Sequence, residues 1–486
     1  MKNLTKLLFC FSIFLASCTT IPVLDQSGLP KEFDENFIWG INGHPIWSHD
    51  YENAPLEQQI SLLKEHQFDY YRIDVYTDSN GNVIQSKVKR FEELLKLAKK
   101  NNIKILPGLS VYKSLENIQF QITEDEAYDM GYKQAKSFLI KYSDFFDYYV
   151  LGNELDIKTI LGREYRGISS EDYDLQKLTL VASYLRGMID AIKKYDLTSQ
   201  TVINSTGGVH FGFYEILDKL QVKFDIIGYH WYSKNNVGLF EISDLNVDVL
   251  STFNKTFNKP IWITEINRYE GSRYNAEEEQ AHMMELYLNN INNKNSVQAF
   301  FVYELYDQPH LVNAKWAGSK ESYYGIVGWK SDPPDYSKYY YKPVSNVLKY
   351  KIEEAKNGKE DFIYAILFDL YKTQPNEEDL HDWASRLDVL NNQELVISEI
   401  LENNNSEIYS ELTNQYNPQE SLQFIISVYQ AFLKRNPAEK EIRYWRRALK
   451  KRVSFKDFIV KILLSEEYWE YAIWSGYEKR TGYKKP

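Results

Sequence analysis

The stretch "YYVLGNELD", Tyr148–Asp156, begins as an apolar run and ends on Asn153, Glu154 and Asp156. A strand that is buried on both faces of a parallel sheet has this apolar character, which predicts a strand over Tyr148–Asn153. Its polar end has two interpretations: the strand simply stops there, or Glu154 is directed into a site. The second interpretation requires further strands whose ends meet this one on the same face of the molecule.

Seven further apolar runs of strand length occur along the chain. They are Phe37–Ile41, Tyr70–Tyr76, Ile103–Leu109, Thr201–Thr206, Phe224–Tyr232, Pro260–Glu265 and Val297–Leu305. Amphipathic stretches separate them, such as "KRFEELLKLAKKNN", in which Phe91, Leu94, Leu95 and Ala98 repeat at helical spacing. This alternation predicts an α/β fold, a (β/α)₈ TIM barrel, over residues 33–357. A doubly wound open sheet is the alternative, although "GINGHP" is a poor match to its glycine-rich first turn.

The composition is typical of a soluble globular protein with two or three domains. The 486 residues are 43% hydrophobic and 26% charged, and the net charge of -11 argues against a nucleic-acid binder. The aromatic share of 15% supplies rings that can stack on flat apolar faces. The eight histidines are scattered without metal-ligand spacing, and no phosphate-binding loop occurs, so neither a metal nor another cofactor is expected.

The N-terminus, "MKNLTKLLFCFSIFLASCTT", has Lys2 and Lys6 before a short apolar core. This pattern predicts a signal peptide over residues 1–17, too short to be a membrane span. Its end resembles the bacterial lipoprotein box, which implies cleavage before Cys18, acylation of Cys18 and a tether over residues 18–32. The protein is then expected to be lipid-anchored in the bacterial cell envelope. An ordinary signal peptide that is cut nearby is the alternative.

The predicted strand ends bring together the polar residues Arg72, Asp74, Asn153, Glu154, His230, Tyr232, Glu265, Tyr303 and Glu304, with His44 just after the first strand. In a (β/α)₈ barrel these ends form the face that carries active sites. Glu154 and Glu265 end the fourth and seventh strands and face each other across the barrel mouth. Two such carboxyl groups can act as acid and nucleophile in glycoside hydrolysis with retention, for which they lie about 5–5.5 Å apart.

"YVLGNELD", "DIIGYHWYS" and "KPIWITEINR" resemble the motifs of strands four, six and seven of clan A glycoside hydrolases, most nearly family 39-like enzymes. "YYRIDVY" resembles strand two of the same group. The resemblance covers Phe33 to about Asn357. It implies that Glu154 is the general acid/base, that Asn153 binds the sugar 2-hydroxyl and that Glu265 is the nucleophile.

The same resemblance implies that Arg72 and one strand-six residue, Tyr232 or His230, keep the nucleophile charged and oriented. Of these two, one is expected to point away from the site, and His230 then becomes an ordinary core histidine. Electrostatics agrees with the division of roles. A cation and a hydroxyl donor favour an ionised Glu265, whereas Glu154, which faces a second carboxylate, is expected to hold its proton.

One position departs from the clan pattern. The clan commonly has a tryptophan at the end of strand eight as a platform under the sugar, and here Tyr303 takes that place. Tyr303 still offers a ring to stack on, and Trp329 or Trp316 from the following loop are candidates to enlarge it. Further candidates for sugar subsites are Trp47, Tyr112 and Trp231.

Beyond residue 360 the chain is predicted to be helical, with an internal repeat at an offset of 62 over residues 361–420 and 421–486. Pro375 and Trp383 correspond to Pro437 and Trp445. The first copy has 13 acidic and 2 basic residues, and the second has 15 basic and 7 acidic. Either the two copies dock on each other, or the basic copy contacts an acidic surface polymer or partner.

The second copy, in "FIISVYQAFLKRNPAEKEIRYWRRALKK", resembles a short helical repeat of unknown function on bacterial surface and exopolysaccharide-associated proteins. Together these patterns predict a retaining glycoside hydrolase that acts on a β-linked polysaccharide or oligosaccharide, with an endo-acting role on exopolysaccharide preferred over exo action. The expected partners are this carbohydrate and, through Cys18, a membrane. The alternative is a non-catalytic carbohydrate-binding or structural surface lipoprotein on a barrel scaffold.

Overall fold

The computed structural model describes residues 33, 36–78, 80–111, 120–162, 164–233, 239–291, 296–313, 319–390, 393–402, 407–414, 416–417, 421–451 and 453–481. The predicted signal peptide, Cys18, the predicted tether, Tyr112 and Trp316 lie outside these residues. Lys31–Lys356 belong to one compact unit and Asn357–Pro486 to another.

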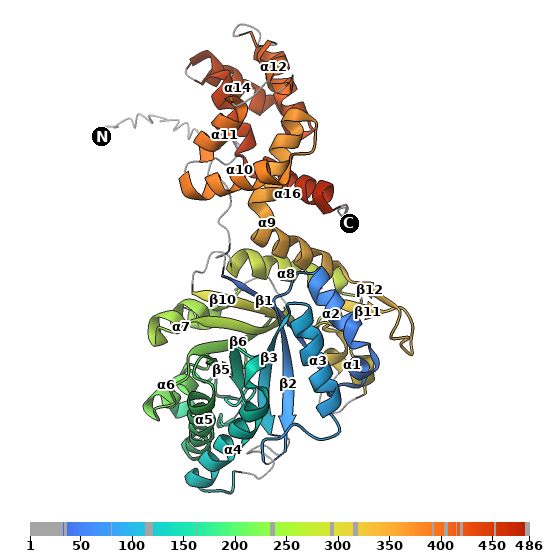
Figure 1. Cartoon of the computed structure of the whole chain (residues 1–486). Helices are drawn as coiled ribbons and strands as arrows, with labels where there is room; N and C mark the ends of the chain where they lie inside the picture. The colour runs from blue at the N-terminus through green and yellow to red at the C-terminus, as the bar shows by residue number, and fades with distance from the viewer. Residues whose placement is uncertain are drawn as a thin grey trace, which may run out of the picture. The chain divides into compact units, whose positions relative to one another are not determined.

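The first unit is a closed barrel of eight parallel strands, in the order β1-β2-β3-β4-β5-β6-β9-β10, with β10 pairing back to β1 (Figure 1). The barrel strands are β1 (Ile38–Gly43), β2 (Tyr70–Thr77), β3 (Lys104–Val111), β4 (Tyr148–Leu151), β5 (Gln200–Ser205), β6 (Ile226–Ser233), β9 (Ile261–Arg268) and β10 (Val297–Val302). Each overlaps one predicted apolar run. The predicted TIM barrel is therefore confirmed.

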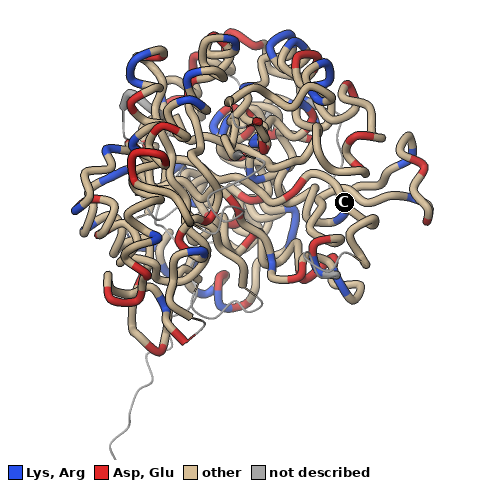
Figure 2. Tube along the Cα trace, turned by 90° about the horizontal axis from the view of Figure 1, so that it is seen from below, with Lys and Arg blue, Asp and Glu red and all other residues tan. Residues whose placement is uncertain are grey.

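The barrel strands are connected by helices that form its outer layer (Figure 1). These are α1 (His49–Asn53), α2 (Leu56–Glu65), α3 (Val88–Lys100), α4 (Glu124–Tyr142), α5 (Leu175–Tyr195), α6 (Phe211–Lys219), α7 (Val249–Phe257), α8 (Glu277–Ile291) and the start of α9 (Pro343–Tyr371). The buried face of α3 consists of Phe91, Leu94, Leu95 and Ala98, the residues whose spacing predicted the helix. Basic and acidic residues are interspersed along the trace (Figure 2), as is usual for solvent-exposed helices.

Short elements complete this unit. They are the two-stranded pairs β7 (Glu241–Ile242) with β8 (Val247–Asp248) and β11 (Val327–Trp329) with β12 (Tyr339–Tyr341), and the 3₁₀ helices η1 (Ser143–Phe145), η2 (Ser170–Asp172), η3 (Ser243–Leu245), η4 (Pro309–Leu311) and η5 (Ser319–Tyr323).

Large side chains form a separate buried cluster to which seven of the barrel strands contribute. Its members are Tyr70, Leu106, Val150, Val202, Ile226, Trp262, Ala299 and Phe301. A strand alternates its side chains with a period of two, so the next inward positions of β2, β5 and β6 are Arg72, Asn204 and, two steps on, His230. The cluster thus packs the barrel interior, and polar groups occupy the layer towards the carboxyl ends.

All elements of the second unit among the described residues are helices, which confirms the predicted C-terminal all-α region. After α9 follow α10 (Glu377–Leu390), α11 (Gln393–Glu402), α12 (Glu407–Asn414), α13 (Ser421–Val428), the π-helical turn η6 (Tyr429–Leu433), α14 (Glu439–Lys451), α15 (Phe455–Leu463) and α16 (Glu466–Thr481). The ends of α9 and η6, and the starts of α10 and α14 and of α11 and α15, differ by the repeat offset of 62. Within the described part of the chain, no helix combines the length and apolarity that a membrane span needs.

Candidate active site

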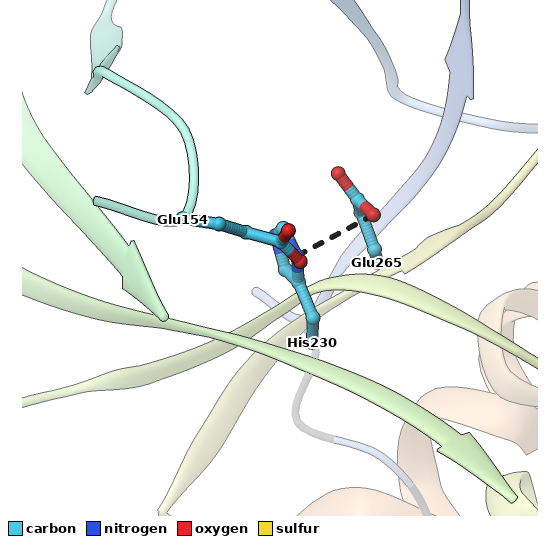
Figure 3. Close-up of side chains that lie close together, drawn as sticks. All are labelled: Glu154, His230 and Glu265. Atoms are coloured by element: carbon cyan, nitrogen blue, oxygen red, sulfur yellow. Dashed lines mark hydrogen bonds and ion pairs between the residues drawn. The ribbon is translucent and has the colours of Figure 1, made fainter. Parts of the chain in front are cut away.

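Glu154 and Glu265 lie close together at the carboxyl ends of the barrel strands. Glu154 follows β4 and Glu265 belongs to β9, and Figure 3 shows both side chains directed towards the same space with His230 of β6 beside them. One carboxylate oxygen from each glutamate and Nδ1 of His230 all lie within 4.8 Å of one another. Residues that are 111 positions apart in the sequence therefore form one site.

The orientation of Glu265 depends on an irregularity in β9. Trp262 packs in the barrel interior, so in a regular strand Thr264 would share its face and Glu265 would point the other way. The pairing with β6 shifts at this point, because Tyr229 is opposite Ile263 whereas His230 is opposite Glu265. The pairing of β9 with β10 shifts in the same stretch. Thr264 is therefore an extra residue in β9. It reverses the alternation of inward and outward side chains and turns Glu265 inward, as bulges near active sites do.

Arg72 and Tyr232 hold the Glu265 carboxylate. The guanidinium of Arg72 donates to Glu265 Oε1 over 2.7 Å, and the hydroxyl of Tyr232 donates to Oε2 over 2.8 Å. Arg72 in turn donates to the side-chain oxygens of Asn42 and Asn153. Burial and the charge of Glu265 raise the pKa of Tyr232, so its hydroxyl keeps the proton that it donates. A carboxylate that is 8% exposed is thus supplied with a cation and a hydroxyl donor.

The turn that carries Glu154 starts earlier than predicted. The prediction that the strand runs to Asn153 is wrong: β4 ends at Leu151, and Gly152 and Glu154 both have left-handed backbone angles, with φ of 73° and 48°. Such a conformation at a residue other than glycine costs about 1–3 kcal/mol, and its surroundings must hold it. Here the Glu154 N–H donates to Asn204 Oδ1 over 2.8 Å. Asn204 of β5 therefore fixes the turn.

Asn153 is oriented by the same network. Its side-chain oxygen accepts from Asn204 over 2.9 Å as well as from Arg72 over 2.8 Å. Because the oxygen is engaged by two donors, the amide group of Asn153 has a defined orientation and its NH₂ group faces away from them. Asn153 itself is exposed, so this NH₂ group is available to a bound molecule.

His230 connects the two glutamates. Its Nδ1 lies 2.7 Å from Glu154 Oε1 and 3.4 Å from Glu265 Oε2. The expectation that either His230 or Tyr232 points away is wrong, because residues two apart in a strand share a face and both reach the carboxylates. Burial favours a protonated Glu154, but the hydrogen bond and charge of His230, followed by the charge of Arg72, outweigh it and lower the pKa of Glu154. The expectation that Glu154 holds its proton is therefore wrong for the free protein.

A second polar cluster surrounds His44, which follows β1. Its Nδ1 lies 3.5 Å from Asp74, and its Nε2 lies 3.3 Å from the hydroxyl of Tyr303 and 3.5 Å from Glu304. Burial raises the pKa of Glu304 to about 8 against the charge of His44. Glu304 is completely buried and bonded to Tyr51 and Gln308, so it supports this cluster from within the protein.

The two candidate platform residues lie in different surroundings. The ring of Tyr303 is 6.1 Å from that of Tyr232, the residue whose hydroxyl donates to Glu265. Trp329 instead packs on Tyr306 and Tyr336, and its indole N–H donates to the carbonyl of Asp307. The structure therefore brings Tyr303, Asn153, Arg72, His230 and Tyr232 together around the two glutamates, whereas the contacts of Trp329 belong to the loops after β10.

Sequence reasoning missed three residues of this site. Asn42 and Asn204 lie near the ends of β1 and β5, where attention to strand ends alone would have found them. Glu321 lies in η5 of the loop after β10. Burial raises the pKa of Glu321 to about 7 against the charge of Lys320, and Glu265 and Glu154 add to the increase, so a third carboxyl group is electrostatically coupled to the pair. No local pattern predicts where such a loop residue comes to lie.

Among the described residues, Glu154, His230 and Glu265 form the one group of acidic and histidine side chains close enough together to hold a metal ion. His230 and Glu154 are, however, in direct hydrogen-bond contact, which leaves no space for an ion between them. The absence of a metal from the reaction stays a prediction.

Comparisons with known proteins agree with this geometry. Residues 192–320 match the family model of the glycosyl hydrolase catalytic core, a segment that contains His230, Tyr232 and Glu265. No curated protein matches the sequence. A family 1 β-glucosidase from Thermotoga maritima is similar in structure, with a TM-score of 0.50 and 14% identity over 68% of this chain and 99% of that chain.

The β-glucosidase from Thermotoga maritima in complex with deoxynojirimycin has a TM-score of 0.48, with the same identity and coverage. At 14% identity these likenesses concern the fold. The matched catalytic core, together with the barrel and its paired glutamates, supports glycoside hydrolase activity.

Proposed function

We propose that the protein is a retaining glycoside hydrolase that cleaves β-linked sugars, with Glu265 as nucleophile and Glu154 as general acid/base. The observation that carries this proposal is that an oxygen of Glu154 lies within 4.8 Å of an oxygen of Glu265. Retaining enzymes have carboxyl groups about 5–5.5 Å apart, whereas inverting enzymes need about 6.5–9.5 Å to fit a water molecule.

In the first step Glu265 attacks the anomeric carbon and forms a glycosyl ester, while Glu154 gives its proton to the departing glycosidic oxygen. In the second step Glu154 takes a proton from water, which displaces Glu265 with a second inversion. Arg72 and Tyr232 orient Glu265 for attack and stabilise it as it leaves the sugar. The NH₂ group of Asn153 is in place to donate to a sugar hydroxyl beside the reacting carbon.

The low pKa of Glu154 in the free protein suits the second step, in which the carboxylate acts as base. For the first step it must be protonated. The side chain of Glu154 is 29% exposed, and a bound sugar covers it. Removal of water raises the pKa of a carboxyl group, so substrate binding itself prepares Glu154 as the acid.

The stereochemical course tests the mechanism. The full chain is incubated with a panel of aryl β-glycosides, and NMR records the anomeric configuration of the first sugar released. A β-anomer as first product supports retention, and an α-anomer contradicts it. Azide rescue then separates the roles: Glu265→Ala should give the α-glycosyl azide and Glu154→Ala the β-glycosyl azide. If no glycoside is hydrolysed and Glu265→Ala leaves sugar binding unchanged, the protein is a binding module.

The substrate is proposed to be a polysaccharide that is cut internally, such as a cell-surface exopolysaccharide. This rests on the resemblance of the C-terminal repeats to exopolysaccharide-associated proteins. The size distribution of products from a polysaccharide panel tests it. A mixture of oligosaccharides early in the reaction indicates internal cleavage, and release of only one sugar indicates exo action.

We also propose that the protein is anchored in the bacterial cell envelope through a lipid on Cys18. The support is the signal-like sequence of residues 1–17. Metabolic labelling with a tritiated fatty acid should mark the native chain and not Cys18→Ser. Equal labelling of both, or of neither, contradicts the anchor.

A further inference from the structure

Helix α14, Glu439–Lys451, belongs to the C-terminal helical unit (Figure 1) and packs against its neighbours on one side. Trp445 and Leu449 are buried, the indole N–H of Trp445 donates to the hydroxyl of Tyr429 over 2.9 Å, and its ring centroid lies 4.6 Å from that of Phe458. Because these contacts fix the rotation of the helix, its opposite side is a defined surface.

That opposite side carries a row of cations, here called the α14 stripe. Its members are all exposed: Lys440, Arg443, Arg446, Arg447, Lys450 and Lys451. They recur at helical spacing and so share one face along ~16 Å of helix. Among the described residues, the ion pair of Arg443 with Glu439, at 3.7 Å, is the one that involves the stripe.

The fold does not require this stripe. Like charges three and four residues apart on a helix destabilise it. In the first copy of the repeat, α10 takes the place of α14, and the positions that match Arg443, Arg446 and Arg447 are His381, Ala384 and Ser385. The same helix therefore forms without the cations, which points to a role in binding.

Among the described residues, no acidic side chain of the first copy forms an ion pair with the stripe. Other cations of the second copy make the ion pairs with the first copy, namely Lys434 with Asp369, Arg480 with Asp361 and Lys456 with Glu402. A further cation, Arg435, is engaged within its own copy by Glu441 and Glu467. The two copies thus dock on each other, as one of the two interpretations of their opposite charges expected. Among the described residues, the α14 stripe takes no part in this docking.

We propose that the α14 stripe is a binding site for an anionic polysaccharide, one that carries carboxylate or sulfate groups. The choice of a polysaccharide rests on the proposed function, because the chain would then bind and cleave the same class of polymer. Arginine, which supplies half of the stripe, matches carboxylate and sulfate oxygens with two parallel hydrogen bonds.

A lipid surface fits the stripe less well. A helix that lies in a membrane interface inserts its apolar face into the lipid. The apolar face of α14 is occupied by Tyr429 and Phe458. Among the described residues of this unit, the exposed large hydrophobic side chains are Leu395 and Leu422, outside α14.

The test compares two variants of the full chain, both in a Glu265→Gln background so that polymer is not consumed. The first variant removes four cations of the stripe: Arg443→Gln, Arg446→Gln, Arg447→Gln and Lys450→Gln. The matched control removes four exposed cations of α3: Lys89→Gln, Lys96→Gln, Lys99→Gln and Lys100→Gln. Binding to polygalacturonate, to neutral dextran and to phosphatidylglycerol vesicles is measured at two salt concentrations.

In the stripe variant we expect polygalacturonate binding to weaken about tenfold or more and to depend less on salt. In the control we expect binding to change less than about twofold. The melting temperature of the stripe variant should not fall, since like-charge contacts are removed. Equal binding by both variants, or stripe-dependent binding to the vesicles with none to polygalacturonate, overturns the proposal.

Hydrolysis of aryl glycosides is measured in parallel with Glu265 intact, because a small substrate does not need the stripe. Stripe-dependent polymer binding without any hydrolysis supports the binding site and contradicts the proposed function. Hydrolysis without stripe-dependent binding supports the proposed function and contradicts the binding site on α14.

Discussion

The end of β9 and the turn after β4 present the same side chain in opposite ways. Glu265 is 8% exposed and receives Arg72 over 2.7 Å and Tyr232 over 2.8 Å, all from barrel strands. Glu154 follows a left-handed turn, has a side chain that is 29% exposed, and meets His230 alone over 2.7 Å. The first carboxylate is held in place by two side chains from barrel strands, whereas the second is more exposed, which suits the exchange of a proton with a leaving group under the proposed function. Environment, rather than residue type, divides the two roles.

The largest effect on kcat is expected from substitution of Glu265. Glu265→Gln keeps the shape and removes the nucleophile, so kcat on any β-glycoside should fall by about 10⁴-fold or more. Steady-state kinetics with an aryl glycoside measures it. Glu278→Gln, at an exposed position of α8, is the control and should leave kcat unchanged. A Glu265→Gln variant with more than a tenth of native kcat would falsify the assignment of the nucleophile.

At Glu154, the loss of kcat/KM on substitution should depend on the substrate. Glu154→Gln cannot protonate a leaving group, so kcat/KM should fall about 10²- to 10⁴-fold for a phenyl glycoside. It should change little for a 2,4-dinitrophenyl glycoside, whose leaving group needs no proton. A plot of log(kcat/KM) against leaving-group pKa should therefore steepen in the variant. Parallel lines for the two proteins contradict the role of general acid.

Removal of Arg72, the cation that donates to Glu265, should affect both stability and rate. Arg72→Gln leaves a buried carboxylate without its ion-pair partner, which costs about 3–5 kcal/mol of unfolding free energy. The loss of a preorganised donor should lower kcat about 10²-fold. Urea denaturation and kinetics measure the two effects.

Arg90→Gln is a suitable control for this variant, because Arg90 donates to the carbonyls of Pro45, Tyr51 and Ala54 and not to a carboxylate of the site. It should lose stability and keep kcat. If Arg72→Gln behaves in the same way, Arg72 is merely structural.

The pH profile should distinguish the two carboxylates more finely. His230 lowers the pKa of Glu154, while burial acts in the other direction. His230→Phe should therefore raise the pKa of Glu154, so that the acid stays protonated to higher pH and the basic limb of kcat/KM moves to higher pH. The replacement is mild, because His230 Nε2 has no hydrogen-bond partner among the described residues. A basic limb that stays in place, or moves down, contradicts this link.

The smallest effect is expected at the turn itself. Asn204→Ala removes the acceptor of the Glu154 N–H and the donor to Asn153, which should cost about 1–3 kcal/mol of unfolding free energy and lower kcat about tenfold. Asn204→Asp keeps the acceptor and should lose less stability than Asn204→Ala. Equal stability of Asn204→Ala and the native protein would show that the turn does not depend on Asn204.

Much of the barrel could be predicted because its signals are local. Runs such as Tyr70–Tyr76 are apolar over strand length, and the helical spacing of Phe91, Leu94, Leu95 and Ala98 returns as the buried face of α3. The internal repeat was also visible, since Pro375 and Pro437 follow the ends of α9 and η6. The placement of Glu154 just after the fourth barrel strand and of Glu265 on the seventh follows from counting such runs.

Local sequence patterns could not predict how the side chains of the site are oriented. The sequence "IWITEIN" has no mark of the shift in β9, and a regular strand would have turned Glu265 away from Arg72. The proton on Glu154 was mispredicted because the direction of His230 depends on the register of β6 against its neighbours. Glu321 comes from a loop segment whose next two residues, Ser322 and Tyr323, accept backbone hydrogen bonds from Gln308 and Ser272.

The sequence by itself thus determined the barrel and the helical character of the C-terminal region, because apolar periodicity encodes which face of each element is buried. Only the tertiary structure decided which groups surround Glu154 and Glu265 and which cations of α14 form ion pairs among the described residues. Hydrogen bonds, ion pairs and burial depend on neighbours that are 76 residues away for Glu154 and His230 and 193 residues away for Arg72 and Glu265. Such neighbours exist only once the barrel has closed.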